Sequence, residues 1–199
     1  MLTNVLSLSL ALLPIVQGAV LPKRAAAVSC ETVLTGTLAA FTTDGTLPTT
    51  GANVSLHFTS EATAFLSTDG ADVLFNFQSC NSTFMGYEGK HFGHIVPVSE
   101  LDACLSAALG ASAGPPFLVL NDECSYTDDD SQLMQYWHFA QDNELLFVGE
   151  TKVSAQANHT APYTLVLDPF FGEQAIRVAP SGTSNDTVVS LAIVPITVA

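Results

Sequence analysis

Apolar and polar side chains alternate along several short stretches of this chain, and a period of two residues is typical of half-buried β-strands. Residues 54–59 show the pattern clearly, because every second side chain there is apolar. Residues 73–80 and 163–167 repeat it. Gly, Pro, Asn or Asp residues lie near the ends of these stretches, and those residue types favour turns. The pattern therefore predicts short strands joined by turns.

About twelve such strands can be placed, and their spacing predicts an all-β fold of the sandwich or barrel kind. The expected strands are 32–38, 54–59, 62–67, 73–80, 94–98, 103–107, 117–120, 134–139, 145–149, 163–167, 176–178 and 188–194. One helical pattern competes at 100–109, but Gly110 would end it early, and a turn entering a strand fits equally well. The apolar run 188–199 contains Pro195 and follows a short polar spacer, which favours a buried final strand over a lipid-anchor signal.

The N-terminus has the pattern of a secretory signal peptide. Residues 5–16 are mostly apolar and too few to span a bilayer, and small residues follow up to Gly18. Lys23 and Arg24 then resemble a dibasic processing site of fungal secreted proteins, the alternative being two solvated basic side chains. We therefore expect a signal peptide at 1–18, a propeptide at 19–24 and one secreted, extracellular domain at 25–199. No second apolar run predicts a membrane span.

The charge balance narrows the possible partners. After removal of the leader, three basic residues (Lys90, Lys152 and Arg177) face 19 acidic ones, a net charge of −16 with histidine neutral. Such a surface repels phosphate backbones and anionic lipids, so neither nucleic acid nor a membrane surface is an expected partner.

Four cysteines in a secreted chain favour two disulfides over free thiols. Three pairings are possible. Joining Cys30 to Cys80 and Cys104 to Cys124 closes two sequence-local loops, and this is the pairing we predict. The cysteines lack the close spacing of a zinc site.

Four sequons follow the Asn-x-Ser/Thr pattern and predict N-glycosylation, which would require these side chains to face solvent. They begin at Asn53, Asn81, Asn158 and Asn185.

The middle of the chain carries a recognisable order of residues. Cys104 is followed by an apolar strand at 115–120, then Cys124, then the triplet Gln135, Tyr136 and Trp137. This order resembles one repeat of the ricin-B-like lectin family, and it is similar to small secreted fungal proteins of that type. The resemblance covers about residues 93–139. It implies a β-trefoil of three repeats, with Trp137 in the core and Gln135 bonded to backbone.

The resemblance also implies carbohydrate binding, but the positions that hold the sugar in such a repeat differ here. Ser106 occupies the position where the family has an acid, and Met134 occupies the position of the amide. The position of the aromatic ring falls in the polar stretch 121–123. We therefore expect a degenerate sugar site in this repeat.

A shallow alternative sugar site is conceivable at Tyr163, Asp168 and Phe170, against the simpler interpretation of buried aromatic rings beside a turn acid.

Other chemistry was weighed on the same residues. His91 and His94, with Glu88 nearby, could form a metal site if they lay on a helix, because their spacing would then put both imidazoles on one face. The surrounding glycines favour a loop instead, so no metal site is expected. Residues 128–130 are acidic but lack EF-hand spacing, which favours a solvated loop. Carboxylates for hydrolysis could come from Glu88, Glu150 or Asp168. No nucleophile elbow or phosphate loop occurs, so we expect no enzyme, no catalytic residue and no cofactor.

The sequence therefore predicts a secreted, non-catalytic protein that binds a carbohydrate or another surface ligand. The alternative is a secreted β-trefoil inhibitor or effector that binds an extracellular protein through loops such as 125–131 and 154–162.

Overall fold

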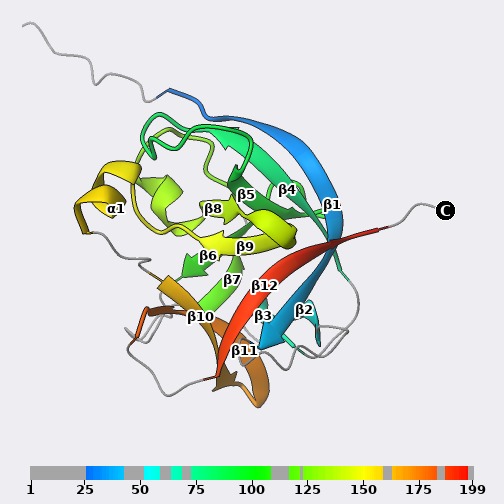
Figure 1. The fold of residues 1–199 in the computed structure, drawn as a ribbon. Helices are drawn as coiled ribbons and strands as arrows, with labels where there is room; N and C mark the ends of the chain where they lie inside the picture. The colour runs from blue at the N-terminus through cyan, green and yellow to red at the C-terminus, as the bar shows by residue number, and fades with distance from the viewer. Residues whose placement is uncertain are drawn as a thin grey trace, which may run out of the picture.

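The protein is all-β, as the alternating pattern predicted. The computed structural model describes residues 26–42, 52–58, 64–68, 73–108, 117–121, 123–158, 163–182 and 187–196. Within these residues twelve strands join in a single sheet, and two disulfides are formed (Figure 1).

The strands are short, apart from the first. They are β1 Ser29–Thr42, β2 Ala52–Phe58, β3 Ala64–Ser67, β4 Leu74–Asn81, β5 Phe92–Pro97, β6 Cys104–Ala108, β7 Phe117–Asn121, β8 Trp137–Phe139, β9 Glu144–Phe147, β10 Tyr163–Phe170, β11 Glu173–Pro180 and β12 Val188–Pro195. Two 3-10 helices, η1 Asp130–Met134 and η2 Gln141–Asn143, and one α-helix, α1 Lys152–Asn158, lie between them.

Six of the strands are joined by a circuit of pairings that returns to its start. The antiparallel pairs run from β1 to β4, β5, β8, β9 and β12, and β12 pairs again with β1. Figure 1 shows β1, in blue, running beside β12, in red. Gly36 permits this contact, because a Cβ there would collide with the carbonyl oxygen of Val194.

The other six strands form three hairpins, β2–β3, β6–β7 and β10–β11. The hairpins also pair with one another: β3 pairs with β7 and β11, and β11 pairs with β7. Each hairpin therefore pairs with the two others as well as within itself.

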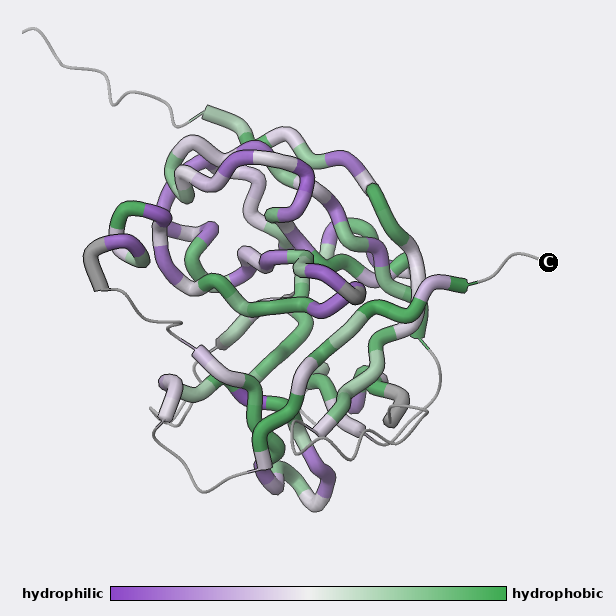
Figure 2. Tube along the Cα trace, viewed as in Figure 1, coloured by the Kyte–Doolittle hydropathy of each residue, from purple (hydrophilic) through white to green (hydrophobic). Residues whose placement is uncertain are grey.

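The main core lies between the circuit of six strands, which we also call the ring, and the three hairpins. It is built from inward-facing side chains of almost every strand, and the largest of them include Trp137, Phe75 and Phe77. Figure 2 shows hydrophobic residues following β12 and its neighbours. A smaller cluster lies outside the ring and contains Met85 and Tyr136.

The tryptophan and glutamine of the triplet connect separate parts of the fold. Trp137 is fully buried, its Nε1 donates to the Leu105 carbonyl oxygen at 3.2 Å, and its ring packs edge-on against Phe147. Gln135 Nε2 donates to the Ser125 carbonyl at 2.8 Å, and the Ser125 backbone N–H donates back to Gln135 Oε1 at 3.3 Å. The indole thus ties β8 to β6, and the amide fixes the segment after Cys124.

The two disulfides join Cys30 to Cys80 and Cys104 to Cys124, as predicted. Cys30 and Cys80 are directly opposite each other on β1 and β4. The second disulfide ties the start of β6 to the segment that follows β7. Disulfides of this kind fit an oxidising, secretory environment.

Several expectations about local structure are corrected. The stretch 100–109 is a turn followed by β6, so its helical pattern is not realised. Residues 152–158, expected to belong partly to a loop, form α1. Thr151 starts this helix, because its Oγ1 accepts from the Ser154 N–H and its carbonyl accepts from the Ala155 N–H. β10 continues through Pro169, which the antiparallel pair tolerates close to its hairpin end.

The sequons lie in different settings. Asn81 is exposed at the end of β4, Asn53 lies in β2 and Asn158 ends α1. Asn185 lies outside the described residues, as do the expected signal peptide (1–18) and propeptide (19–24) with Lys23 and Arg24. In the described part of the chain no helix is long and apolar enough to cross a membrane.

We expect Trp137→Phe to lower the free energy of unfolding by about 2–4 kcal/mol, because it leaves a cavity and deprives the Leu105 carbonyl of its donor. Urea denaturation followed by far-ultraviolet circular dichroism would measure this. Val153→Ala, at a side chain that is 76% exposed on α1, is the matched control and should change stability by less than about 0.5 kcal/mol. Equal stability of the two variants would contradict the role given to the indole.

Candidate functional site

A groove opens beside the turn between β8 and β9. Its volume is about 660 Å³, and it is lined by His91, His138, Phe139, Ala140, Gln141 and Glu144. A cleft of this size lies within the range of roughly 300–1,000 Å³ that small-molecule sites occupy. They come from the residue before β5, from β8, and from the β8–β9 turn with the first residue of β9.

Backbone hydrogen bonds hold the two sides of the groove together. The Phe139 N–H donates to the His91 carbonyl at 2.7 Å, and the Ala140 N–H donates to the Glu144 carbonyl at 2.8 Å. Asn143 takes a left-handed conformation at φ 62°, which asparagine tolerates better than most residues, and so lets η2 turn directly into β9. The lining side chains are therefore carried on a short, fixed turn.

An aromatic stack supports His138 from behind the groove lining. Phe92 and His138 are directly opposite on β5 and β8, and their ring centroids are 4.5 Å apart with planes inclined by 12°. Tyr87 stacks on the other face of this pair, 4.6 Å from Phe92. The stack fixes the orientation of the His138 imidazole at the groove.

Glu144 is the carboxylate among the lining residues, and it also faces a second hollow. Its Oε1 accepts from Ser190 Oγ at 2.7 Å, which orients the side chain. The second hollow, of about 390 Å³, shares Gln141 and Glu144 with the groove and continues over Phe41 and apolar residues of β12. Polar and apolar surfaces therefore meet at Glu144.

The His138 imidazole is suited to act as a neutral hydrogen-bonding group. Burial lowers the pKa of His138, the nearby His91 lowers it further, and Glu144 partly opposes both effects. A neutral imidazole has one donor and one acceptor nitrogen.

The structure separates His91 from His94, the pair weighed for a metal site. His91 ends the turn before β5, whereas His94 lies within the strand. His91 is exposed at the groove, whereas His94 is fully buried on β5. Gly93 lies between them because a Cβ there would collide with the carbonyl oxygen of Gln78 on β4.

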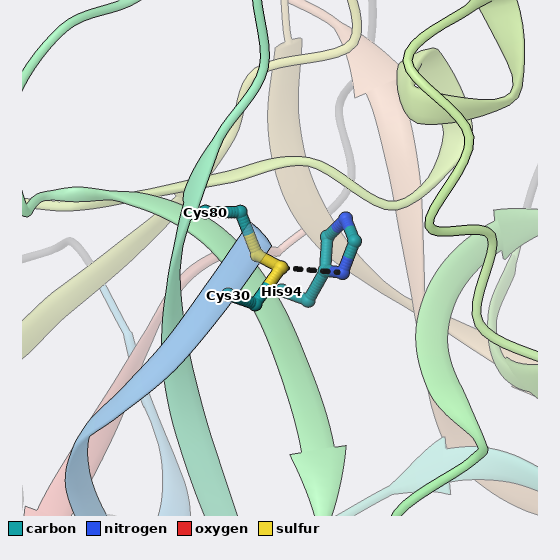
Figure 3. Close-up of side chains that lie close together, drawn as sticks. All are labelled: Cys30, Cys80 and His94. Atoms are coloured by element: carbon teal, nitrogen blue, oxygen red, sulfur yellow. Dashed lines mark hydrogen bonds between the residues drawn. A yellow bond between two sulfur atoms is a disulfide. The ribbon is translucent and has the colours of Figure 1, made fainter. Parts of the chain in front are cut away.

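His94 lies between the two disulfides. Its Nδ1 is 3.9 Å from Cys30 Sγ, as Figure 3 shows, and its Nε2 is 2.8 Å from Gln132 Oε1. A ligand atom of His94 and the sulfurs of either disulfide lie within 4.8 Å of one another. Burial lowers the pKa of His94 to about 4, and the hydrogen bond to Gln132 only partly opposes this.

The residues considered for an alternative sugar site are not brought together. Tyr163 and Phe170 begin and end β10, about 23 Å apart at the usual rise of a strand. Asp168 forms an ion pair with Arg177 at 2.6 Å, and the Phe170 ring stacks on Phe117. These contacts give Asp168 and Phe170 structural partners within the β10–β11 and β7 region.

The positions where the resemblance would place a sugar also lack the necessary chemistry. Ser106 is buried and donates to the Cys104 carbonyl at 3.5 Å, while Met134 is 40% exposed. Glu123 is exposed. A groove ligand would therefore be held at a different place from the sugar of a ricin-B-like repeat.

The acidic stretch 128–130 is more ordered than the solvated loop we expected. Asp128 accepts hydrogen bonds from Ser82, from the Thr83 backbone and hydroxyl, and from the Phe84 N–H. Asp129 caps η1 by accepting from the Ser131 N–H at 3.0 Å. Two of the three acids thus organise loops.

The three carboxylates considered for hydrolysis are not lining residues of the groove. Glu88 is exposed, Glu150 lies close enough to Tyr87 to help raise its pKa, and Asp168 pairs with Arg177. The groove residues Gln141 and Glu144 were missed by the sequence interpretation. The signal that could have found them is the short connection between the expected strands 134–139 and 145–149.

Acid should destabilise the protein partly through His94. Its pKa in the folded protein, about 4, lies below the usual 6.5, so the unfolded chain binds a proton first as the pH falls. The stability that the neutral imidazole contributes is complete above pH 6.5 and is lost as the pH falls from 6.5 to about 4, by about 3 kcal/mol at most. Urea denaturation at several pH values across this interval should show a smaller loss in His94→Asn than in the wild type.

His57→Asn, on β2 away from both disulfides, is the control and should keep the wild-type dependence on pH. An equal loss of stability in His94→Asn and the wild type would show that other groups cause the acid sensitivity.

No protein-family model matches this chain, and no curated protein matches it. What the protein binds therefore has to follow from the chemistry of its own residues.

Proposed function

We propose that this protein is a secreted, non-catalytic carbohydrate-binding protein of the β-trefoil type, and that the groove at the β8–β9 turn is its glycan site. The observation that carries the proposal is the convergence of one carboxylate, one amide and two imidazoles beside a phenyl ring in a groove of about 660 Å³.

The circuit of strand pairings supports the trefoil assignment. The chain divides into three successive groups of four strands, β1–β4, β5–β8 and β9–β12. Each group supplies two strands to the six-membered circuit and one hairpin to the set of three that pair together. This threefold division is what the ricin-B-like resemblance implies. The signal-peptide pattern and the two disulfides support secretion.

The lining residues offer the hydrogen bonds that a sugar requires. Glu144 can accept from two adjacent hydroxyls, Gln141 can both donate and accept, and the His91 and His138 rings add further polar nitrogens. Phe139 and, in the adjoining hollow, Phe41 supply apolar surface for the C–H faces of a sugar ring. Hydrogen bonds to a charged group contribute about 1.5–3 kcal/mol each, so Glu144 is expected to dominate affinity.

The charge of the site favours neutral or amino sugars. Glu144 is negatively charged when ionised, and the chain carries 19 acidic residues against five basic ones. Sulfated or uronic acid glycans would meet like charge at the groove and at long range. An amino group, in contrast, could pair with the Glu144 carboxylate.

The groove supports binding better than hydrolysis. Most glycoside hydrolases use two carboxyl groups on opposite sides of the bond that is cleaved. Among the residues that line the groove, Glu144 is the one carboxylate. A single carboxylate can orient a sugar, but it does not provide the acid and base pair.

A second candidate function is recognition of an extracellular protein, in line with the inhibitor or effector alternative. Its support is the β10–β11 turn, where Phe171 is 69% exposed and sits edge-on to Phe170. Of the loops expected to make such contacts, 125–131 is instead bonded to η1 and Gln135, which makes it a less adaptable surface.

Glycan-array screening of the secreted protein should identify neutral or amino-sugar ligands, and Glu144→Gln should weaken binding of the best ligand at least about tenfold. The substitution removes charge and keeps shape, so isothermal titration calorimetry would report the hydrogen bonds of the carboxylate. Phe171→Ser is the matched control and should bind the glycan as the wild type does.

Two results would count against the proposal: no binding to any glycan at millimolar concentration, or full affinity in Glu144→Gln. Capture of a secreted protein by the wild type but not by Phe171→Ser would favour the second candidate function.

A further inference from the structure

The Cys30–Cys80 disulfide lies in a setting that its structural role does not require. Its two sulfurs are next to a buried imidazole on one side (Figure 3). On the other side both cysteines line a hollow of about 330 Å³ with Tyr87, Gly89 and Lys90. Cys30 is partly exposed at this hollow, and Cys80 beside it is buried. A small thiol therefore has a route to the first disulfide.

The hydrogen bonds around Gln132 fix which nitrogen of His94 carries the proton. Gln132 Nε2 donates to the Ser125 carbonyl at 2.8 Å and to the Thr127 carbonyl at 2.9 Å. Gln132 Oε1 must therefore face His94, so His94 Nε2, 2.8 Å away, is the protonated nitrogen. His94 Nδ1 is left with its lone pair directed toward Cys30 Sγ at 3.9 Å.

We infer that Cys30, Cys80 and His94 form a binding site for a soft or borderline metal ion such as Zn²⁺ or Cu⁺, which the disulfide masks and which reduction by a dithiol opens. This site is independent of the proposed glycan groove and goes beyond it.

The distances agree with such a site. Tetrahedral zinc with Zn–S near 2.3 Å and Zn–N near 2.0 Å places sulfur and nitrogen ligands about 3.6 Å apart and two sulfurs about 3.8 Å apart. The nitrogen to sulfur distance in the disulfide form, 3.9 Å, is already close to this value. Once the S–S bond is broken, the two sulfurs need only separate from each other by side-chain rotation. An N–H donated to a protein oxygen is also what metal-binding histidines usually have on their second nitrogen.

The strands would keep the two thiols together after reduction. Cys30 and Cys80 are flanked in the β1–β4 ladder by the pairs Ser29 with Asn81 and Glu31 with Ser79. Tyr136 also donates to the Cys80 carbonyl at 2.7 Å. β1 is held further along by seven register pairs with β12. Loss of the disulfide therefore leaves both cysteines in place.

Reduction of the disulfide and binding of the metal ion are two separate steps. An external dithiol attacks one sulfur of the disulfide and then closes its own disulfide, so two electrons and two protons pass to Cys30 and Cys80. Binding of Zn²⁺ then releases the two thiol protons to solvent, while His94 Nδ1 contributes its lone pair and loses no proton. Two thiolates cancel the charge of Zn²⁺, which suits a site this close to the buried cluster of Met85 and Tyr136.

The test compares the oxidised protein with protein reduced by a dithiol and desalted without oxygen, each titrated with Zn²⁺ against a colorimetric chelator. We expect one Zn²⁺ per reduced chain and binding at least about 100-fold weaker in the oxidised chain. Reduced His94→Asn should bind at least about tenfold more weakly. His57→Asn, whose ring packs against Phe65 on the β2–β3 hairpin, is the matched histidine control and should bind as the wild type does.

Alkylation mapped by mass spectrometry provides a second measurement on the wild type, which does not depend on how His94→Asn folds. Zn²⁺ should protect Cys30 and Cys80 from alkylation in the reduced protein. Protection of Cys104 and Cys124 instead, unchanged affinity in a folded His94→Asn, or loss of the β-sheet circular dichroism on reduction would each overturn the inference.

Discussion

Pairing of the first described strand with the last is the constraint on which the rest of this structure depends. Seven register pairs join β1 to β12 and complete the circuit of six strands, so the first and last described strands hold each other in place. Within the described residues this circuit gives each of the six strands a partner on both sides. It also brings Ser190 on β12 to Glu144, and so orients the carboxylate of the groove.

Within this circuit, the triplet Gln135, Tyr136 and Trp137 contacts two separate hydrophobic clusters, the main core and the smaller cluster that contains Met85. Trp137 points into the main core and bonds to β6, whereas Tyr136 points outward, where its hydroxyl donates to the Cys80 carbonyl. Burial raises the pKa of Tyr136 to about 12, so this donor keeps its proton across the physiological range. Gln135 holds the segment after Cys124. One short stretch thus joins the core, both disulfide regions and the covering loop.

The fold was more accessible to sequence reasoning than the site. Alternation of side chains predicts strands because one face is buried, and the choice of two sequence-local loops predicted both disulfides. The wrong predictions of local structure each depended on a single residue. Thr151 starts a short helix where a loop was expected, and Pro169 stays within β10 where the strand was expected to have ended. The groove depends on Glu144, His91 and Ser190, which come together only through pairings between β5, β8, β9 and β12. No local pattern carries that information.

The outer face of β5 explains why its residues were hard to interpret from the sequence. Phe92 and His94 lie two residues apart and so share this face, whereas Ile95 points into the main core. Phe92 stacks on His138, which lines the groove, while the segment that contains Gln132 covers His94. An unbroken solvated face would have left His94 free to ionise. Because the segment after Cys124 folds back over it, the same strand supports His138 at the groove through Phe92 and carries a neutral imidazole between two disulfides.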